Sequence, residues 1–188
     1  MVADADLKTR SVLQGKSVKI AVLGAGAWGT ALAMNLSQRH QVSLWARNAG
    51  HVSGMRKARA NPLYLGDFKF NDQLSVEDDL QAALDGADLI LSVVPTAGFR
   101  GILKDIKALG SSLPIIWAHK GLEPQSAKLP YEVALEELGS AHKWGALSGP
   151  SFALEVARGQ PTALVAATAG VVILITFFTI IFGELVPK

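Results

Sequence analysis

The sequence predicts an α/β fold with a doubly wound, mostly parallel sheet, and three observations predict it. Short apolar runs alternate with helix-forming runs along most of the chain, as is typical of parallel sheets. A glycine-rich run, Gly24-Ala25-Gly26-Ala27-Trp28-Gly29, joins the first apolar run to the first helical run. The stretch 88–95 is apolar along most of its length, like strands that a parallel sheet buries on both faces.

The glycine-rich run, residues 24–29, is called the glycine loop below. It follows a predicted strand at 18–23 and precedes a helix-forming run at 30–36. A strand, a glycine turn and a helix in this order suit the pyrophosphate of a dinucleotide. Gly24 makes the tight turn, Gly26 lets the backbone approach the phosphates, and Gly29 lets the helix pack on the strand. The free N–H groups at the start of the helix then face the anion, so the sequence predicts a Rossmann-type cofactor site.

The residues after the second predicted strand bear on the choice of cofactor. We expect the first helix to end near His40 and the second strand to cover 41–45. A site specific for NAD usually places Asp or Glu after this strand, but here Arg47 follows it. A guanidinium can pair with a ribose 2′-phosphate, which favours NADP(H) or the use of both cofactors. A solvated arginine is the other interpretation.

The rest of the chain continues the alternation. A basic, exposed helix is expected at 49–60 and a turn at 61–66. Ser75, followed three residues later by Asp78, predicts the start of a helix that runs to Gly86. We expect later strands at 88–95, 114–118, 144–147 and 162–168, and helices at 97–109, from 123 to 138 with an interruption at Pro130, and at 152–157.

Two of these strands end in residues suited to ligand contact. The strand at 88–95 ends in Pro95 and Thr96, and the strand at 114–118 is followed by His119 and Lys120. Because ligands bind at the carboxyl ends of strands in open α/β sheets, these ends should share a rim with the glycine loop. Lys120 is placed to contact a substrate anion or carbonyl; the alternative is a surface lysine that follows a strand.

Composition excludes several classes of site. The 188 residues suffice for one domain with a sizeable core, 49% of them are hydrophobic, and the formal net charge of +2 argues against a nucleic-acid platform. The absence of cysteine excludes disulfides and thiolate chemistry and fits a reducing cytoplasm. The histidines show no metal spacing, so no metal site is predicted. Residues 1–17 mix acidic and basic side chains and are expected to be a flexible leader rather than a signal peptide.

Over residues 17–168 the chain resembles the amino-terminal domain of the bacterial NAD(P)-dependent glycerol-3-phosphate dehydrogenases. The ordered pair HKGLE and SGPSFA is more specific than the glycine loop, which many dehydrogenases share. The matching stretches are GAGAWGTALA at 24–33, LWAR at 44–47, NPLYL at 61–65, VVP at 93–95, WAHKGLE at 117–123 and SGPSFALEVARGQPTA at 148–163.

The resemblance implies a reaction and a set of contacts. The reaction is the interconversion of sn-glycerol 3-phosphate and dihydroxyacetone phosphate with NAD or NADP, in glycerol-3-phosphate metabolism and phospholipid biosynthesis. Lys120 would meet both cofactor and substrate, and its ammonium beside the C2 oxygen would favour the polarised carbonyl. The remaining implied contacts are Ala27, Trp28, Arg47 and Ala153 for the cofactor, and Gly149 and Ser151 for the substrate. His119 receives no role.

The general base expected from this resemblance is missing. Members of the family continue into a helical second domain whose lysine, in a G-x-x-K-N context, takes the hydroxyl proton. Lys128, Lys143 and Lys188 lack that context. Positioned proton transfer contributes about 10²–10⁴ in rate, so we expect cofactor binding but negligible turnover by this chain alone.

Residues 169–188 differ from the rest of the chain. No charged residue lies between Arg158 and Glu184, and the stretch resembles part of the membrane domain of hemolysin-like, CorC-type transporters. A membrane-seeking helix is favoured, although residues 169–182 alone are fewer than the about 20 that span a bilayer. An extension that packs on the sheet and an aggregation-prone β segment stay open. The change in composition also suggests a truncated or fused coding product, joined near 168–170.

Three other functions stay open at this point. A different Rossmann dehydrogenase, such as a ketopantoate or hydroxyacid reductase, would lack the HKGLE and SGPSFA pair. A catalytically silent dinucleotide-binding module attached to a membrane would explain the missing base. A non-functional fragment would expose an unfinished interface and aggregate. The sequence leaves the oligomeric state and the preference between NAD and NADP undecided.

Overall fold

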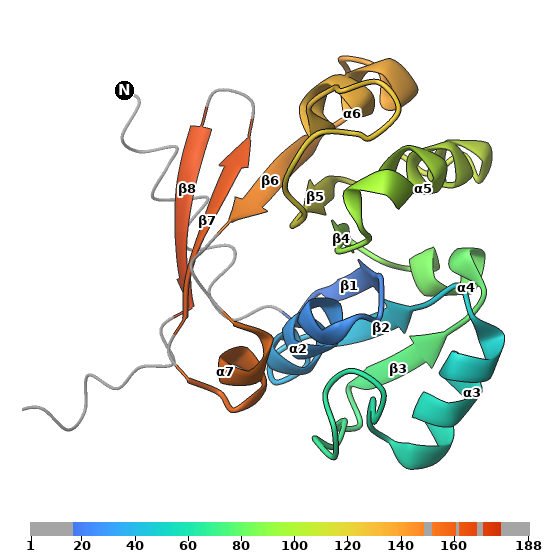
Figure 1. Ribbon diagram of the computed structural model, residues 1–188, viewed down its shortest axis with the longest axis vertical. Coiled ribbons are helices and arrows are strands. Elements are labelled where there is room, and N and C mark those ends of the chain that lie inside the picture. Colours follow the sequence, from blue (N-terminus) through green and yellow to red (C-terminus); the bar gives the residue numbers. More distant parts are fainter. Residues whose placement is uncertain (1–16, 149–151, 161, 169–170, 178–188) are drawn as a thin grey trace, which may run out of the picture.

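The computed structural model describes residues 17–148, 152–160, 162–168 and 171–177, with the backbone alone for the last two ranges. The strands are β1 (Lys19–Leu23), β2 (Gln41–Trp45), β3 (Leu74–Glu77), β4 (Leu89–Ser92), β5 (Ile115–Trp117), β6 (Trp144–Ser148), β7 (Thr162–Thr168) and β8 (Val171–Phe177). They form one eight-stranded sheet in the order β3-β2-β1-β4-β5-β6-β7-β8 (Figure 1). Neighbours from β3 through to β6 are parallel, whereas β7 pairs antiparallel with both β6 and β8.

Helices cover both faces of this sheet (Figure 1). They are α2 (Ala27–Leu36), α3 (Ala49–Ala58), α4 (Leu80–Leu84), α5 (Thr96–Ala108), α6 (Pro130–Leu138) and α7 (Ala153–Ala157). One hydrophobic core joins α2 and α3 to one face, and a second joins α4, α5 and α6 to the other. A smaller cluster packs α7 against the outer side of α2. The predicted doubly wound, Rossmann-type α/β fold is therefore confirmed.

The two cores explain why the central strands read as continuous apolar runs. In β1, Ile20 and Val22 belong to the core under α2, whereas Ala21 and Leu23 belong to the core under α5. All four side chains are buried, because alternate residues of a strand point to opposite faces. Helix α5 closes the second core with four buried residues at helical spacing: Phe99, Ile102, Leu103 and Ile106.

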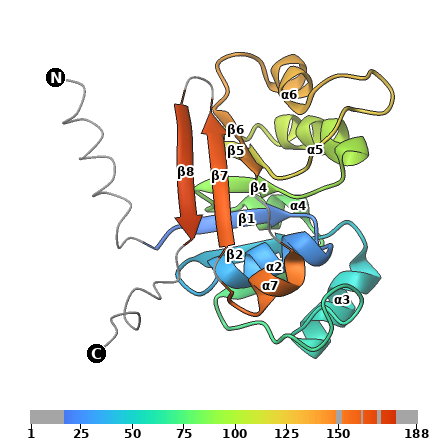
Figure 2. The same ribbon diagram turned by 60° about the vertical axis from the view of Figure 1, so that its left-hand side comes forward.

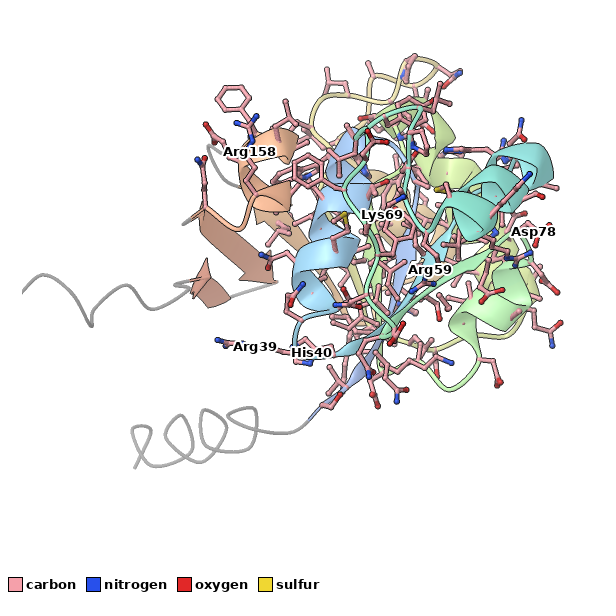
Figure 3. The ribbon with its side chains drawn as sticks, turned by 90° about the horizontal axis from the view of Figure 1, so that it is seen from below. Arg39, His40, Arg59, Lys69, Asp78 and Arg158 are labelled. Carbon is pink, nitrogen blue, oxygen red and sulfur yellow. The ribbon has the colours of Figure 1, made fainter. Side chains whose placement is uncertain are left out.

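The chain reverses direction across the sheet beside β1. After β1 it moves outward to β2 and β3, and then crosses back to β4 on the other side of β1. Ligands of open α/β sheets bind at such a switch point, outside the carboxyl ends of the strands. In Figure 3, Asp78, which follows β3, lies on the opposite side of the molecule from Arg39 and His40, which precede β2. The glycine loop follows β1 directly and so belongs to the carboxyl rim.

The predicted helix start at Ser75 is wrong. Ser75 lies in β3, which pairs in parallel with β2, with Ser43 opposite Ser75. This segment forms a strand because it pairs with the free edge of β2. Leu74 and Val76 are buried while Ser75 is exposed, which is the alternation of a half-buried strand. The helix α4 begins later, where the Asp79 side chain accepts a hydrogen bond from the N–H of Gln81.

Two other helix boundaries also differ from the prediction. Helix α2 ends at Leu36, before His40, because a hydrogen-bonded turn follows it. Helix α6 begins only at Pro130, and residues 123–129 are not helical. Proline suits the first turn of a helix, where its missing N–H needs no partner, so Pro130 starts this helix rather than interrupting it.

The predicted membrane helix is wrong for Val171–Phe177, which form β8. This strand pairs with β7 along its whole length, from Thr168 opposite Val171 to Thr162 opposite Phe177, and lies beside β7 in Figure 2. Residues rich in Val and Ile favour strands, and the outer edge of β7 offers N–H and C=O groups for pairing. Residues 169–170 and 178–188 lie outside the described part. No helix in the described part of the chain combines the length and the apolar composition that a membrane span requires.

Candidate functional site

The first glycine of the glycine loop is required by its surroundings. Gly24 has φ +114°, and a Cβ there would lie 2.9 Å from the carbonyl carbon and oxygen of Val93. Its N–H donates to the carbonyl oxygen of Trp45 at 2.9 Å. The turn is therefore held between the ends of β2 and β4, in a conformation that L side chains rarely adopt.

The other two glycines differ from each other. A Cβ on Gly29 would lie 1.9 Å from the carbonyl oxygen of Gly24, so the helix can approach the turn only with glycine at this position. Gly26 has an extended backbone with φ −74°, and a Cβ built there would meet no atom within 4 Å. The packing of the protein itself therefore does not require glycine at position 26. The absence of a side chain there keeps the space in front of the loop open.

The first turn of α2 presents free hydrogen-bond donors to this space. The first N–H bonded within this turn is that of Thr30, which donates to Gly26 at 2.9 Å. The N–H groups of Ala27, Trp28 and Gly29 have no partner among the described residues, and glycine as N-cap supplies no side-chain acceptor. No acidic side chain occupies the turn. Free donors at the positive end of a helix dipole fit a pyrophosphate.

Arg47 lies at the same rim, after β2, and is exposed. Its side chain has no hydrogen-bond or ion-pair partner within the part of the chain that the structure describes. The acidic residues at the end of β3, the strand paired with β2, are Glu77 and Asp78, and both are instead paired with Arg56, at 3.0 and 3.2 Å. The charge of Arg47 is therefore not neutralised by these carboxylates and is available to an anion such as a ribose phosphate.

Lys120 is exposed and lies three residues beyond β5. Its carbonyl oxygen accepts a 2.8 Å hydrogen bond from the Thr96 hydroxyl, and Thr96 is the first residue of α5. Because α5 follows β4, and the N–H of Val93, directly after β4, donates to the carbonyl oxygen of Leu23 at 2.8 Å, these contacts join the ends of β1, β4 and β5. The structure therefore brings Lys120 to the rim that carries the glycine loop, as predicted.

The loop after Lys120 is held by ion pairs around Arg100. The guanidinium of Arg100 contacts Glu123 at 2.8 Å, Glu136 at 2.9 Å and Glu137 at 2.5 Å. These four residues are called the Arg100 cluster. Hydrogen bonds from Arg100 and Ser126 lower the pKa of Glu123 to about 2, and those from its three carboxylate partners raise the pKa of Arg100. The only sequence signal for this cluster is the place of Glu123 in the HKGLE stretch.

His119, which received no role from the sequence, is partly exposed, but both of its ring nitrogens are buried. Neither Nδ1 nor Nε2 has a hydrogen-bond partner among the described residues, and the ring centroid lies 4.3 Å from that of Phe99. Burial lowers the pKa of His119 to about 4, because removal from water disfavours the charged imidazolium. His119 is therefore neutral at pH 7.

Asn61 is a buried residue that sequence reasoning treated only as part of a turn. Its side chain lies behind the glycine loop and hydrogen-bonds to Ala25 and Thr30, and it is fully inaccessible to solvent. The only available signal was its place in the NPLYL stretch, which does not reveal what the carboxamide contacts.

The remaining predicted site residues lie near α7. Ala153 is the first residue of α7 and packs, as does Trp28, against a cluster formed by Ala31, Leu65 and Val156. This packing brings the start of α7 to the side of α2. Gly149 and Ser151 lie outside the described residues.

Two other features bear on the position of the site. A hollow of about 640 Å³ is lined mainly by residues 84–87 and 109–113. These residues precede β4 and β5, so the hollow lies toward the amino ends of the strands, whereas the glycine loop lies at their carboxyl ends. Within the described residues, no group of three or more His, Asp or Glu side chains is placed to hold a metal ion.

Comparison with known proteins identifies the family. The model of the NAD-dependent glycerol-3-phosphate dehydrogenase N-terminus matches residues 19–171. A glycerol-3-phosphate dehydrogenase (NAD(P)+) from Methylobacillus flagellatus is 64% identical over 150 residues, which are 80% of this chain and 46% of the relative. The corresponding enzyme from Aromatoleum aromaticum is 49% identical over the same shares of the two chains.

The fold agrees with part of a solved glycerol-3-phosphate dehydrogenase structure. A crystal structure of glycerol-3-phosphate dehydrogenase from Coxiella burnetii has a TM-score of 0.73 and 38% identity, and the match covers 81% of this chain and 47% of that one. The chain thus spans slightly less than half the length of the relatives that it matches. The predicted cofactor class, NAD or NADP, agrees with the names of the family and of these relatives. The chain belongs to the family of NAD-dependent glycerol-3-phosphate dehydrogenase amino-terminal domains.

Proposed function

We propose that this chain forms the NAD(P)-binding part of a glycerol-3-phosphate dehydrogenase, an oxidoreductase that interconverts sn-glycerol 3-phosphate and dihydroxyacetone phosphate. The observation that carries the proposal is the first turn of α2. Its N–H groups at residues 27–29 lack partners among the described residues, and the space before Gly26 is open. The family match over residues 19–171 supports the same function.

The cofactor contacts follow from this geometry. The glycine loop, with the N–H groups of Ala27 and Trp28, holds the pyrophosphate. Arg47 lies toward the ribose, where its unneutralised charge accommodates a 2′-phosphate. Ala153 approaches from α7, in keeping with the packing of α7 on α2. Bound in this way, NAD(P) supplies or accepts the hydride of the reaction.

The substrate is proposed to lie beside Lys120. Its ammonium would stabilise negative charge that develops on the C2 oxygen of dihydroxyacetone phosphate and would attract the phosphate. Gly149 and Ser151 are proposed as further substrate contacts on the basis of the SGPSFA stretch. The fixed backbone position of Lys120, held by Thr96 and followed by the Arg100 cluster, supports an orienting role for this residue.

Turnover is proposed to require more than these 188 residues. No lysine in a G-x-x-K-N context occurs among them, and the relatives are more than twice as long as the matched region. We therefore expect these residues to bind cofactor with negligible turnover. The predicted domain boundaries, a leader at 1–17, a cofactor domain at 18–168 and a separate tail at 169–188, also stay proposals.

Titration with NADH and NADPH, followed by cofactor fluorescence, tests the proposal. Saturable binding by the 188-residue chain is expected, and Gly26→Val should abolish it because the side chain enters the space meant for the pyrophosphate. Gly101→Val is the matched control, since a Cβ on this exposed helical glycine also meets no atom within 4 Å. Absence of binding by a monodisperse wild-type chain would overturn the proposal.

We also propose a cytoplasmic location, supported by the absence of cysteine and by the cofactor chemistry. Attachment to a membrane through residues 178–188 is the competing outcome. Fractionation of cells that express the chain distinguishes the two: recovery with the membrane fraction after a high-salt wash would contradict the cytoplasmic proposal. Sequencing the parent transcript across 168–170 tests the fused coding product, and an uninterrupted natural reading frame would count against it.

A further inference from the structure

We propose that Asn61 is a positioning residue for the dinucleotide: its side chain holds the glycine loop in the shape that exposes the N–H groups of α2. The inference rests on the proposed function and deepens it. Asn61 has no exposed surface, so it acts on a bound cofactor through the backbone of the loop rather than by contact.

The carboxamide of Asn61 joins three parts of the fold. Its Nδ2 donates to the carbonyl oxygen of Ala25 at 2.9 Å and to the hydroxyl of Thr30 at 2.7 Å. Its Oδ1 lies 2.9 Å from Nε2 of His51 in α3. One side chain therefore links the middle of the glycine loop, the first turn of α2 and the neighbouring helix.

These contacts fix the orientation of the carboxamide. Ala25 offers only a carbonyl oxygen, so the NH₂ group of Asn61 must face the loop. Oδ1 then faces His51, whose Nε2 must carry the hydrogen that it donates. All three polar contacts are satisfied in one arrangement only, so Asn61 specifies the position of Ala25 rather than merely filling space.

Asn61 is itself held firmly by the segment around it. Its carbonyl oxygen accepts hydrogen bonds from the N–H groups of Leu65 and Tyr64, at 2.9 and 3.2 Å. The segment is tied back where Phe70 donates to Arg59 at 2.7 Å and where Ala60 forms a bridge with Lys69. Figure 3 shows Arg59 and Lys69 close together on this segment. These backbone contacts thus hold Asn61 in place while its side chain hydrogen-bonds to the glycine loop.

The site of attachment explains the expected effect on binding. Ala25 is buried between Gly24, which makes the tight turn, and Gly26, where the pyrophosphate approaches. Loss of the carboxamide leaves the carbonyl oxygen of Ala25 without this donor, so the peptide can rotate. The N–H groups of residues 27–29 then no longer point toward the same position. A positioning error of this kind weakens ligand binding without removing any ligand contact.

The test compares Asn61→Ala with Leu65→Ala in the full chain. Leu65 lies in the same segment and is buried against α2 and α7, in a cluster on which Trp28 also packs; its apolar side chain forms no hydrogen bond to the glycine loop. Both variants should lower the melting temperature. Only Asn61→Ala should raise the Kd for NADH, by about tenfold, the size expected for one lost positioning bond. Thr30→Val, which removes one acceptor of the carboxamide and keeps the side-chain shape, should raise the Kd by about threefold and serves if Asn61→Ala does not fold.

Hydrogen exchange of the ligand-free chain supplies a readout besides binding. Amides of residues 25–29 should exchange faster in Asn61→Ala than in Leu65→Ala, relative to the wild type. Equal Kd values and equal loop exchange in the two variants, with a wild type that binds NADH, would overturn the role of Asn61 alone. A wild type that binds neither NADH nor NADPH would overturn the proposed function, and the inference with it.

Discussion

At the residue scale, His119 has two buried ring nitrogens that find no hydrogen-bond partner among the described residues. The charged form is disfavoured in the folded chain, where the pKa is about 4, against an ordinary value of 6.5. Between these two pH values the unfolded chain binds a proton that the folded chain does not. The free energy of unfolding should therefore fall as the pH decreases from 6.5 to 4.

His119→Leu removes this acid sensitivity. The variant keeps an apolar contact with Phe99 and carries no titrating group, so its free energy of unfolding should change less between pH 7 and pH 5 than that of the wild type. Urea unfolding at the two pH values measures both changes. His142→Leu is a control of the same residue type, at a histidine whose Nε2 lies 2.9 Å from the carbonyl oxygen of Leu113. An equal change in wild type and His119→Leu would show that His119 does not contribute.

Arg47 carries a second prediction at this scale. Arg47→Ala should weaken NADPH binding by about tenfold and change NADH binding much less, because only NADPH bears the 2′-phosphate that a guanidinium can pair with. Competitive titration of the two cofactors measures the ratio. Arg39→Ala, on the opposite side of the molecule from Asp78 (Figure 3), serves as control. An unchanged ratio would favour the other interpretation, a solvated arginine.

At the scale of the elements, two glycines in the turn between β1 and α2 are expected to serve different purposes, Gly29 stability and Gly26 cofactor binding. Gly29→Ala should destabilise the fold strongly, because its Cβ would overlap the carbonyl oxygen of Gly24 and force α2 away from β1. A cost of about 2 kcal/mol or more is expected from overpacking. Gly26→Ala, whose Cβ meets open space, should unfold at nearly the wild-type denaturant concentration while binding NADH more weakly. Equal stability of the two variants would contradict this account of the loop.

The packing of α5 against α6 predicts a dependence on acid. Glu123 has a folded pKa of about 2 against an ordinary 4.5, so the stability that it contributes is complete above about pH 4.5. It is lost as the pH falls toward 2, because the unfolded chain then binds the proton more readily. Glu123→Gln should flatten the fall of the free energy of unfolding over this range and lower that energy at pH 7. Parallel acid titrations of variant and wild type, followed by circular dichroism, test this.

At the scale of the whole molecule, the cofactor site and the last strands are separate regions of one sheet. Strand β8 lies at the end of the sheet, and β4, β5, β6 and β7 stand between it and β1. Removal of residues 169–188 should leave the Kd for NADH unchanged within about twofold. It should lower the melting temperature by a few degrees, since about 1 kcal/mol shifts a domain of this size by about 2–4 °C. Loss of NADH binding in a folded, shortened chain would contradict this separation.

The sequence by itself determined the fold class, the order of most elements and the chemistry of the glycine loop. These properties depend on local signals: the apolar runs of β1, β2 and β4, the spacing of Phe99, Ile102, Leu103 and Ile106 in α5, and the three glycines. Each signal reports what a short segment can do with its own backbone and its own face. The resemblance in HKGLE and SGPSFA added the family, which the comparisons confirm.

Only the tertiary structure decided which partners the segments meet. Ser75 belongs to a strand because β2 has a free edge beside it, and Val171–Phe177 belong to a strand because β7 does. Asn61 hydrogen-bonds to the glycine loop because the fold brings it to Ala25, which lies 36 positions earlier in the chain. Hydrogen bonds between distant residues leave no periodic trace in a sequence, since they depend on where two separate segments come to rest.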